Sequence, residues 1–394
     1  MAKETRYDAG VTKTGALRAF LISGFLLALP GGLLPLWGYH VHPEFGTAGN
    51  YFLALGGGMG AAMWLARMLV RRFRPDRILA AGCFLAAAAM VMLSIAAPPS
   101  TVWYEALCVF VTGAAAGLIN GAIFQAVGDA WEEDPAGVTL SGGIYFGTGS
   151  VAASLLMAQS VTAIGYVTAT RVLAVGAAIL AGAAIAFLRV RIEATPVRAE
   201  DEASVRDRRT VLAILFGLLL FFQFANEWSI AGWLAIYLID RLGMSPAGAV
   251  TMLAFYWIAL TLGRIGTALL MQLMPHARLL GISAFCALFG GTAMTFSDAR
   301  GGVIAGILLM GAGFSAIGPL ASERIAPRFS GYHPDYFAGL FMFAMSGGTL
   351  SAAALGHLAG PLGLRVIPIA AMAGSCAVIV LVSVIRLGRK VSGN

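Results

Sequence analysis

Apolar stretches of about 20 residues recur along this 394-residue chain, separated by short segments that carry most of its charge. A helix of about 20 residues is long enough to cross the roughly 30 Å hydrocarbon core of a bilayer. Lipid offers the backbone no hydrogen-bond partners, so a spanning segment of this kind must be helical. Only 11% of the residues are charged, against about 25% in soluble domains. The sequence therefore predicts an all-α membrane protein.

We place twelve transmembrane helices along the chain. The predicted spans are 16–39, 49–70, 78–97, 101–128, 139–162, 169–189, 211–239, 246–273, 278–297, 301–324, 335–360 and 363–386. The longest charged stretch, 189–210, falls between the sixth and seventh spans and has the mixed charge of a linker exposed to water. The predicted domains are an N-terminal six-helix bundle (1–190), a cytoplasmic linker (191–210) and a C-terminal six-helix bundle (211–394).

The basic residues are divided unequally between the two predicted sides of the membrane. If the N-terminus is cytoplasmic, all 26 Lys and Arg residues fall on that side except Arg171, Arg241, Arg300 and Arg365. Basic residues accumulate in cytoplasmic loops, so this pattern places both termini in the cytoplasm. The net charge of +7 reflects this topology and does not indicate nucleic acid. We expect an integral protein of a bacterial inner membrane that acts as a monomer in the lipid bilayer.

The two halves of the chain resemble each other at a shift of about 200 residues. Ala66–Arg67 parallels Gly263–Arg264, and Gly147–Ser150 parallels Ser346–Thr349. These matches share one order and one offset, which indicates an internal repeat. Six spans, a charged central loop and six further spans resemble the major facilitator superfamily over essentially the whole chain. The resemblance implies two pseudo-symmetric bundles around a central site, which they expose alternately to the two sides of the membrane.

Members of that family usually carry a Gly-x-x-x-Asp-Arg-x-Gly-Arg-Arg signature between spans 2 and 3. The corresponding stretch here, residues 67–77, keeps the basic cluster but not the glycines. By this resemblance, charged residues at the inner ends of the helices form a cytoplasmic gate. The residues assigned to the predicted gate are Arg67, Arg71, Asp76, Asp129, Arg264, Glu323 and Arg324, and Asp335 is a further candidate for an ion pair there.

One acidic residue, Glu227, lies deep inside a predicted span. A charge at bilayer depth is costly, so an acid there is a functional hypothesis by default. Gln223 lies one helical turn earlier on the same face, and Asn226 lies beside it. Glu227 could bind substrate or a cation, or carry a coupling proton. The alternative is a structural hydrogen bond to a neighbouring helix.

The stretch Glu227–Tyr237 resembles the Glu-x-x-x-x-Gly-Trp/Phe pattern of span 7 in the fucose:proton symporter family and related glucose transporters. This resemblance implies a neutral sugar as the small-molecule substrate, with a proton or a sodium ion as the coupling cation. Those symporters also have acids in spans 1 and 4, where this chain has none at the corresponding depth. Glu227 would therefore carry the coupling proton alone, or the protein would be an uncoupled facilitator.

Polar and aromatic residues on the helices that line the cavity of the resembled fold complete the predicted binding site. Sugar rings stack their C–H faces on aromatic planes, so several aromatic residues could form a platform. The predicted substrate-binding residues are Glu227, Asn226, Gln223, Asn120, Phe124, Trp37, Tyr145, Trp228, Trp233, Tyr256 and Trp257. For each aromatic residue, packing against lipid or against the core is the alternative role.

A proton-driven exporter of drugs or amphipathic metabolites would share this fold. Many such exporters carry a Gly-Pro pair in span 5, and residues 139–162 contain none. The sequence also has no Walker A motif for ATP and no His-Glu-x-x-His motif for zinc. We therefore predict a secondary active transporter rather than an enzyme, without catalytic residues, cofactor or metal.

Overall fold

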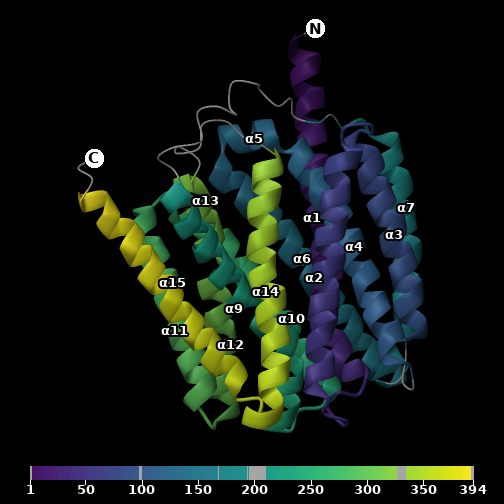
Figure 1. The fold of residues 1–394 in the computed structure, drawn as a ribbon, viewed down its shortest axis with the longest axis vertical. Coiled ribbons are helices and arrows are strands. Elements are labelled where there is room, and N and C mark those ends of the chain that lie inside the picture. Colours follow the sequence, from purple (N-terminus) through teal and green to yellow (C-terminus); the bar gives the residue numbers. More distant parts are fainter. Residues whose placement is uncertain are drawn as a thin grey trace.

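The computed structural model describes residues 2–96, 100–166, 168–192, 194, 210–325 and 334–391, with side chains for all of these except 2–14, 129, 132, 210–213, 323–325 and 386–391. The helices run side by side in one bundle, and both ends of the chain lie at the same end of it (Figure 1). We call this end the terminus end and the opposite one the far end. Most of the predicted linker, residues 195–209, lies outside the described residues.

Twelve helices in the described part of the chain are long and apolar enough to cross a membrane, which confirms the predicted all-α membrane fold. The first half contains α1 (Ala2–Leu36), α2 (Phe45–Leu69), α3 (Pro75–Ile95), α4 (Val102–Ala126), the short α5 (Gly128–Glu133), α6 (Pro135–Ile164), the 3-10 helix η1 (Ala169–Val172) and α7 (Leu173–Arg189). The second half contains α9 (Thr210–Leu242), α10 (Pro246–Leu270), α11 (His276–Phe296), α12 (Arg300–Phe314), α13 (Ile317–Ile325), α14 (Pro334–Leu362) and α15 (Val366–Val391). Each predicted span corresponds to one of these helices, or to a pair in direct succession, with small differences at the ends.

The two halves share the way in which their helices end. Four helices that end at the far end, α1, α6, α9 and α14, are each followed by a glycine with positive φ, the conformation that glycine adopts without steric cost. These glycines are Gly38, Gly165, Gly243 and Gly363. The pairs α1 with α9 and α6 with α14 hold equivalent places in the two halves, so the turns repeat along with the spans.

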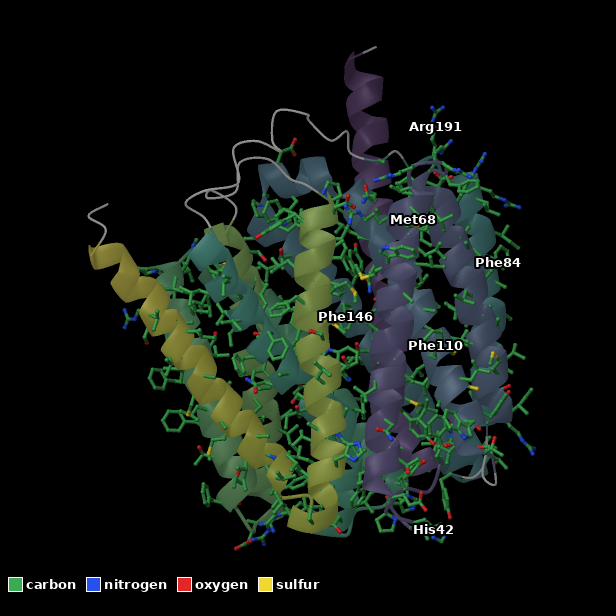
Figure 2. The ribbon with its side chains drawn as sticks, in the orientation of Figure 1. His42, Met68, Phe84, Phe110, Phe146 and Arg191 are labelled. Carbon is green, nitrogen blue, oxygen red and sulfur yellow. The ribbon has the colours of Figure 1, made fainter. Side chains whose placement is uncertain are left out.

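Large apolar side chains cover the outside of the bundle. Phe84 on α3 and Phe110 on α4 are 46% and 40% exposed, and Phe84 projects from the side of the bundle in Figure 2. The charged Arg191 and the polar His42 lie at the terminus end and the far end, respectively (Figure 2). An apolar belt between two polar ends is the arrangement that a bilayer requires of an integral membrane protein.

The two halves touch mainly where α6 packs on α10 and where α2 packs on α14. At the far end, a Cβ at Gly49 would lie 2.7 Å from the carbonyl oxygen of Ala353 and 3.2 Å from Cα of Gly356. The ring Nε2 of His357 lies 3.1 Å from Oδ1 of Asn50 across the same contact. Small residues allow helix backbones to approach this closely, so the far end is closed by direct contact between α2 and α14.

The tenth span, predicted as one segment at 301–324, consists of two helices. α12 ends at Phe314 and α13 begins at Ile317, with a turn at Ser315 and Ala316. Pro319 explains the break, because it has no N–H for a helical hydrogen bond and its ring collides with the carbonyl four residues earlier. Backbone interrupted at membrane depth is tolerated where it lines a cavity or is buried in protein, and this break lines the cavity described below.

Candidate functional site

A cavity lies between the two halves, with about 200 Å³ open to the centres of water-sized molecules. Its walls come from the end of α4, from α5 and α13, from the starts of α6 and α14, from the middle of α9, and from single residues of α1, α10 and α12. The cavity therefore extends from the middle of the bundle toward the terminus end. A single water molecule needs only about 10–15 Å³ of volume defined in the same way, so the cavity is large enough for a small organic solute. Aromatic rings form much of the wall: Phe20, Phe124, Trp131, Phe146, Phe224, Trp228, Phe314, Phe337 and Phe341.

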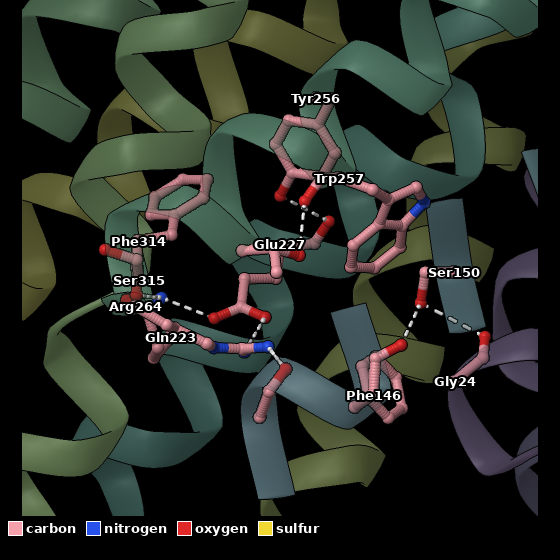
Figure 3. A network of polar contacts seen from close by, with 12 residues as sticks. Gly24, Phe146, Ser150, Gln223, Glu227, Tyr256, Trp257, Arg264, Phe314 and Ser315 are labelled. Atoms are coloured by element: carbon pink, nitrogen blue, oxygen red, sulfur yellow. Dashed lines mark hydrogen bonds and ion pairs between the residues drawn. The ribbon is translucent and has the colours of Figure 1, made fainter. Parts of the chain in front are cut away.

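Glu227 lies in the wall of this cavity, on α9, and is 7% exposed. Nε2 of Gln223, one turn earlier, donates a 2.9 Å hydrogen bond to Oε1 of Glu227. The same nitrogen donates at 3.1 Å to the carbonyl oxygen of Phe314, at the end of α12 (Figure 3). Gln223 therefore ties the acid to the break in the tenth span.

Arg264 on α10 lies near the other oxygen of the Glu227 carboxylate. Its Nη2 lies 3.8 Å from Oε2 of Glu227, and its Nη1 donates a 2.6 Å hydrogen bond to the carbonyl oxygen of Gly143 on α6. The sequence predicts Arg264 as part of the cytoplasmic gate; the structure places it in the cavity wall, where it also contacts the first half. A buried guanidinium is costly without partners, and the nearby carboxylate and carbonyl provide them.

Four predicted binding residues line the cavity: Gln223, Glu227, Trp228 and Phe124. The ring of Phe124 lies edge-on to Phe20, with a centroid distance of 6.4 Å, and 5.2 Å from the ring of Phe341 in the second half. The faces and edges of these aromatic side chains are thus available to the apolar surface of a bound solute.

Three further predicted residues lie beside Glu227 without lining the cavity. The hydroxyl of Tyr256 donates to the backbone carbonyl of Glu227 at 3.3 Å (Figure 3). Trp257 packs 6.1 Å from the cavity-lining ring of Phe146. Asn226 points away from the cavity and against α15, where a Cβ at Gly374 would collide with its amide. These residues support the wall from behind.

The structure does not bring the other predicted binding residues to the cavity. Nε1 of Trp37 donates to the carbonyl of Ala96 at 2.7 Å near the far end. Trp233 is fully buried between the halves, also toward the far end, and donates to the carbonyl of Ala352 at 2.9 Å. Asn120 is fully buried in α4 and Tyr145 is half-buried on α6, and neither lines the cavity.

The predicted gate residues differ in their ion-pair partners. Nε of Arg67 on α2 lies 2.8 Å from Oδ2 of Asp335 on α14, so this pair joins the two halves at the terminus end. Asp76 instead accepts from Nε of Arg74 at 3.0 Å, within the first half. Arg71 is exposed. The side chains of Asp129, Glu323 and Arg324 lie outside the described residues.

A second buried acid, Glu105, lies far from the cavity. It accepts hydrogen bonds from the hydroxyl of Tyr51 and, at 2.5 Å, from that of Ser100. Tyr51 is joined in turn to Tyr39 by a 2.7 Å contact between their hydroxyl oxygens. All four residues belong to the far end of the first half, so Glu105 stabilises this end by hydrogen bonding.

Several cavity residues were not foreseen from the sequence. Trp131 on the short α5 packs 4.2 Å from the ring of Phe337 on α14, which brings the two halves together at the terminus end of the cavity. Phe337 and Phe341 are four residues apart, and this spacing places them on one face of a helix. That spacing was the available signal, but it does not reveal which neighbour the face meets.

Among the described residues, no group of three or more His, Cys, Asp or Glu is placed to hold a metal ion.

Two relatives match the sequence. An uncharacterized MFS-type (major facilitator superfamily) transporter of Yersinia pestis is 30% identical over 311 residues, which are 77% of this chain and 77% of that protein. An uncharacterized transporter of Sinorhizobium fredii is 30% identical over 145 residues, and this match spans only 37% of this chain and 38% of the relative. No protein-family model matches the chain.

Solved structures share the fold. The fucose:proton symporter FucP of E. coli has a TM-score of 0.62 at 16% identity, covering 94% of this chain and 98% of the symporter. The nucleoside transporter NupG, solved as a mutant, has a TM-score of 0.66 at 13% identity, covering 95% of this chain and 98% of that one. Both are transporters, and at these identities the likeness concerns the fold. Together with the Yersinia pestis relative, whose match extends over most of both proteins, this fold places the chain in the major facilitator superfamily.

Proposed function

We propose that this protein is a secondary active transporter that moves a small neutral solute, in the first instance a sugar, together with a proton, by alternating access to the central cavity. The observation that carries the proposal is the position of Glu227, the one carboxylate among the described residues of the cavity wall, between Gln223 and Arg264. In this proposal the terminus end faces the cytoplasm of a bacterial inner membrane, as the distribution of basic residues indicates.

The charges in the cavity favour a neutral solute. Glu227 and Arg264 balance each other, so an uncharged solute needs no further counter-charge from the wall. Their side chains and that of Gln223 offer both donors and acceptors to hydroxyl groups. Aromatic rings such as those of Phe124 and Trp228 offer apolar faces to the C–H side of a sugar ring.

The burial of Glu227 supports its role as the proton carrier. An ionised carboxylate is costly in a low-dielectric place, and a proton removes its charge. Acids of this kind inside membrane helices mark ion and proton pathways in transporters. A neutral sugar that crosses with one proton carries one positive charge, so the uptake should also respond to the membrane potential.

The test is uptake of radiolabelled hexoses into proteoliposomes, with and without an inward proton gradient. Wild type is compared with Glu227→Gln, which keeps the shape of the side chain, and with the control Glu44→Gln, which changes an exposed acid at the far end. We expect gradient-stimulated uptake in wild type and in the control, and its loss in Glu227→Gln. Uptake by Glu227→Gln with unchanged gradient dependence would leave Glu227 a structural role. Uptake that ignores the gradient in all three proteins would indicate a facilitator.

The aromatic wall favours a second candidate, the export of an amphipathic compound in exchange for protons. Rings such as Trp131, Phe146, Phe337 and Phe341 give the cavity a largely apolar surface. With an outward proton gradient, the same reconstituted proteins would then accumulate an amphipathic fluorescent dye as protons leave, and they would take up no hexose. This result would replace the sugar with an amphipathic solute.

A further inference from the structure

Arg264 contacts both halves of the protein at once. Its Nη1 donates a 2.6 Å hydrogen bond to the carbonyl oxygen of Gly143 on α6, in the first half. Its Nη2 lies 3.8 Å from Oε2 of Glu227 on α9, in the second half. The arginine side chain is 12% exposed, so water screens these contacts little. One guanidinium therefore connects the acid of the cavity with a helix of the opposite half (Figure 3).

The absence of a side chain at position 143 makes this contact possible. A Cβ at Gly143 would lie 2.8 Å from Nε and 2.9 Å from Cδ of Arg264, so a larger residue would push the guanidinium away. One turn later on α6, a Cβ at Gly147 would collide with the side chain of Thr261 on α10. The two helices thus approach each other over glycine backbone, which presents the carbonyl of Gly143 directly to Arg264.

The two contacts of Arg264 respond differently to a proton. An ionised Glu227 attracts the guanidinium, and the low dielectric of the interior strengthens this attraction. A protonated Glu227 has no charge, and the carbonyl of Gly143 then remains as the acceptor that the buried guanidinium requires. Protonation of Glu227 therefore weakens the attraction of Arg264 to α9 and leaves its hydrogen bond to Gly143 on α6 as the stronger contact.

Few other groups compete for this guanidinium. Glu227 and Arg264 are the charged side chains among the described residues that line the cavity. Tyr256 is the other titratable group packed against them, and its hydroxyl donates to the backbone carbonyl of Glu227. Gln223 donates a hydrogen bond to the carboxylate of Glu227 at 2.9 Å. The charge of Glu227 is therefore the main variable that acts on Arg264.

We propose that Arg264 links the charge of Glu227 to the contact between the halves. When Glu227 is protonated, the bond from Arg264 to Gly143 holds α6 against α10, and when Glu227 is ionised, Arg264 is drawn toward the acid and this contact loosens. Arg264 is a positioning residue in this scheme, since it transmits the change without carrying the proton. The inference rests on the proposed role of Glu227 as the proton carrier, and it adds the route by which the proton alters the conformation.

The experiment follows the opening of the cavity in purified protein without any solute. Ser322, in the cavity wall on α13, is replaced by cysteine in a background whose native cysteines are replaced by alanine. The rate of alkylation by a maleimide is measured between about pH 5 and pH 8. Buried carboxyl groups commonly gain or lose their proton within this range. Each rate is divided by that of the same protein unfolded in detergent at the same pH, which removes the titration of the thiol itself.

Four variants are compared with the Ser322→Cys parent. Gly143→Ala displaces the guanidinium, and Arg264→Lys keeps the charge but loses the planar fork that reaches two partners. Gly266→Ala is the matched control, since it lies on α10 with open space around the added Cβ. Glu227→Gln removes the proton site itself. Elution as a single species in size-exclusion chromatography establishes that each variant is folded.

We expect the parent and Gly266→Ala to change their alkylation rate with pH by about tenfold, the effect of one charge-assisted contact. Gly143→Ala, Arg264→Lys and Glu227→Gln should each give a flat profile. If Glu227→Gln is flat while Gly143→Ala and Arg264→Lys keep the slope of the parent, the acid is the proton site but the link through Arg264 is wrong. A slope that survives in Glu227→Gln, or a parent without any slope, overturns the proton site and the link together.

Discussion

Arg67 on α2 and Asp335 on α14 form an ion pair with a distance of 2.8 Å between Nε and Oδ2, and it joins the two halves at the terminus end. The two side chains are 55% and 25% exposed. Exposed ion pairs contribute about 0–1 kcal/mol, so this pair favours closure of the terminus end without locking it. A contact of this strength can break and form again in the alternating access that we propose.

Reversal of either charge should open the terminus end. In Arg67→Asp or Asp335→Arg, like charges face each other, and we expect alkylation of Ser322→Cys to become about five times faster, which corresponds to about 1 kcal/mol. The double reversal restores an ion pair and should return the rate to that of the parent. Arg71→Asp, at an exposed neighbouring position, is the control and should leave the rate unchanged. If the double reversal is as fast as the single ones, the pair does not hold this end closed.

A larger residue at Gly49 should prevent closure of the far end. In Gly49→Val the side chain would meet the carbonyl of Ala353, which lies 2.7 Å from even a Cβ at this position. We expect Ala353→Cys, at a site only 3% exposed, to be alkylated at least about tenfold faster in this variant, because an overpacked contact costs about 1–3 kcal/mol. Gly360→Ala, where an added Cβ meets open space, serves as the control on α14. Equal rates in both variants would show that the far end closes by other contacts.

Loss of the Gln223 amide should destabilise the protein. In Gln223→Leu the carbonyl of Phe314 and the carboxylate of Glu227 each lose a buried hydrogen-bond donor. An unsatisfied buried polar group costs about 1–3 kcal/mol, so the thermal unfolding temperature in detergent should fall by several degrees. The exposed Gln272→Leu should unfold at the wild-type temperature. An unchanged unfolding temperature in Gln223→Leu would mean that other groups, or water, satisfy Phe314 and Glu227.

His40 should make the stability depend on pH. It lies in the turn after α1 with a buried Nδ1 and a ring centroid 5.1 Å from that of Tyr166. Burial lowers the pKa of His40 below its usual value of 6.5. The unfolded chain therefore takes up a proton at this site more readily than the folded protein, so this contribution to stability is present above about pH 6.5 and is lost as the pH falls below it.

Thermal unfolding measured from about pH 8 down to about pH 5 tests this expectation. His40→Phe keeps a ring against Tyr166 and should have a flatter profile than wild type. His42→Gln, which changes the exposed histidine of the same turn, should follow the wild-type profile. A profile in His40→Phe as steep as that of wild type would assign the pH dependence to another group.

The sequence by itself determined the membrane class, the twelve spans and the depth of Glu227. Each of these depends on the local run of apolar residues, because lipid selects a helix by the length and composition of its own segment. The family resemblance followed from the same pattern, because the order of six spans, a charged loop and six further spans can be read directly along the sequence. The break at Pro319 also has a local cause, because proline interrupts a helix through its own covalent structure, but the tenth span was predicted as one segment and only the structure showed the break.

Only the tertiary structure decided which of these helices share a cavity and which side chains meet there. Arg67 and Arg264 look equivalent in the sequence, each following a small residue near the end of a span, yet one pairs with Asp335 and the other lies beside Glu227. Trp37 and Trp228 are likewise both aromatic residues inside spans, and only Trp228 lines the cavity. The partner of a buried side chain lies on another helix, many residues away, and is fixed by the register and rotation with which the helices pack. Those quantities depend on all the contacts of the bundle at once, and no single segment contains them.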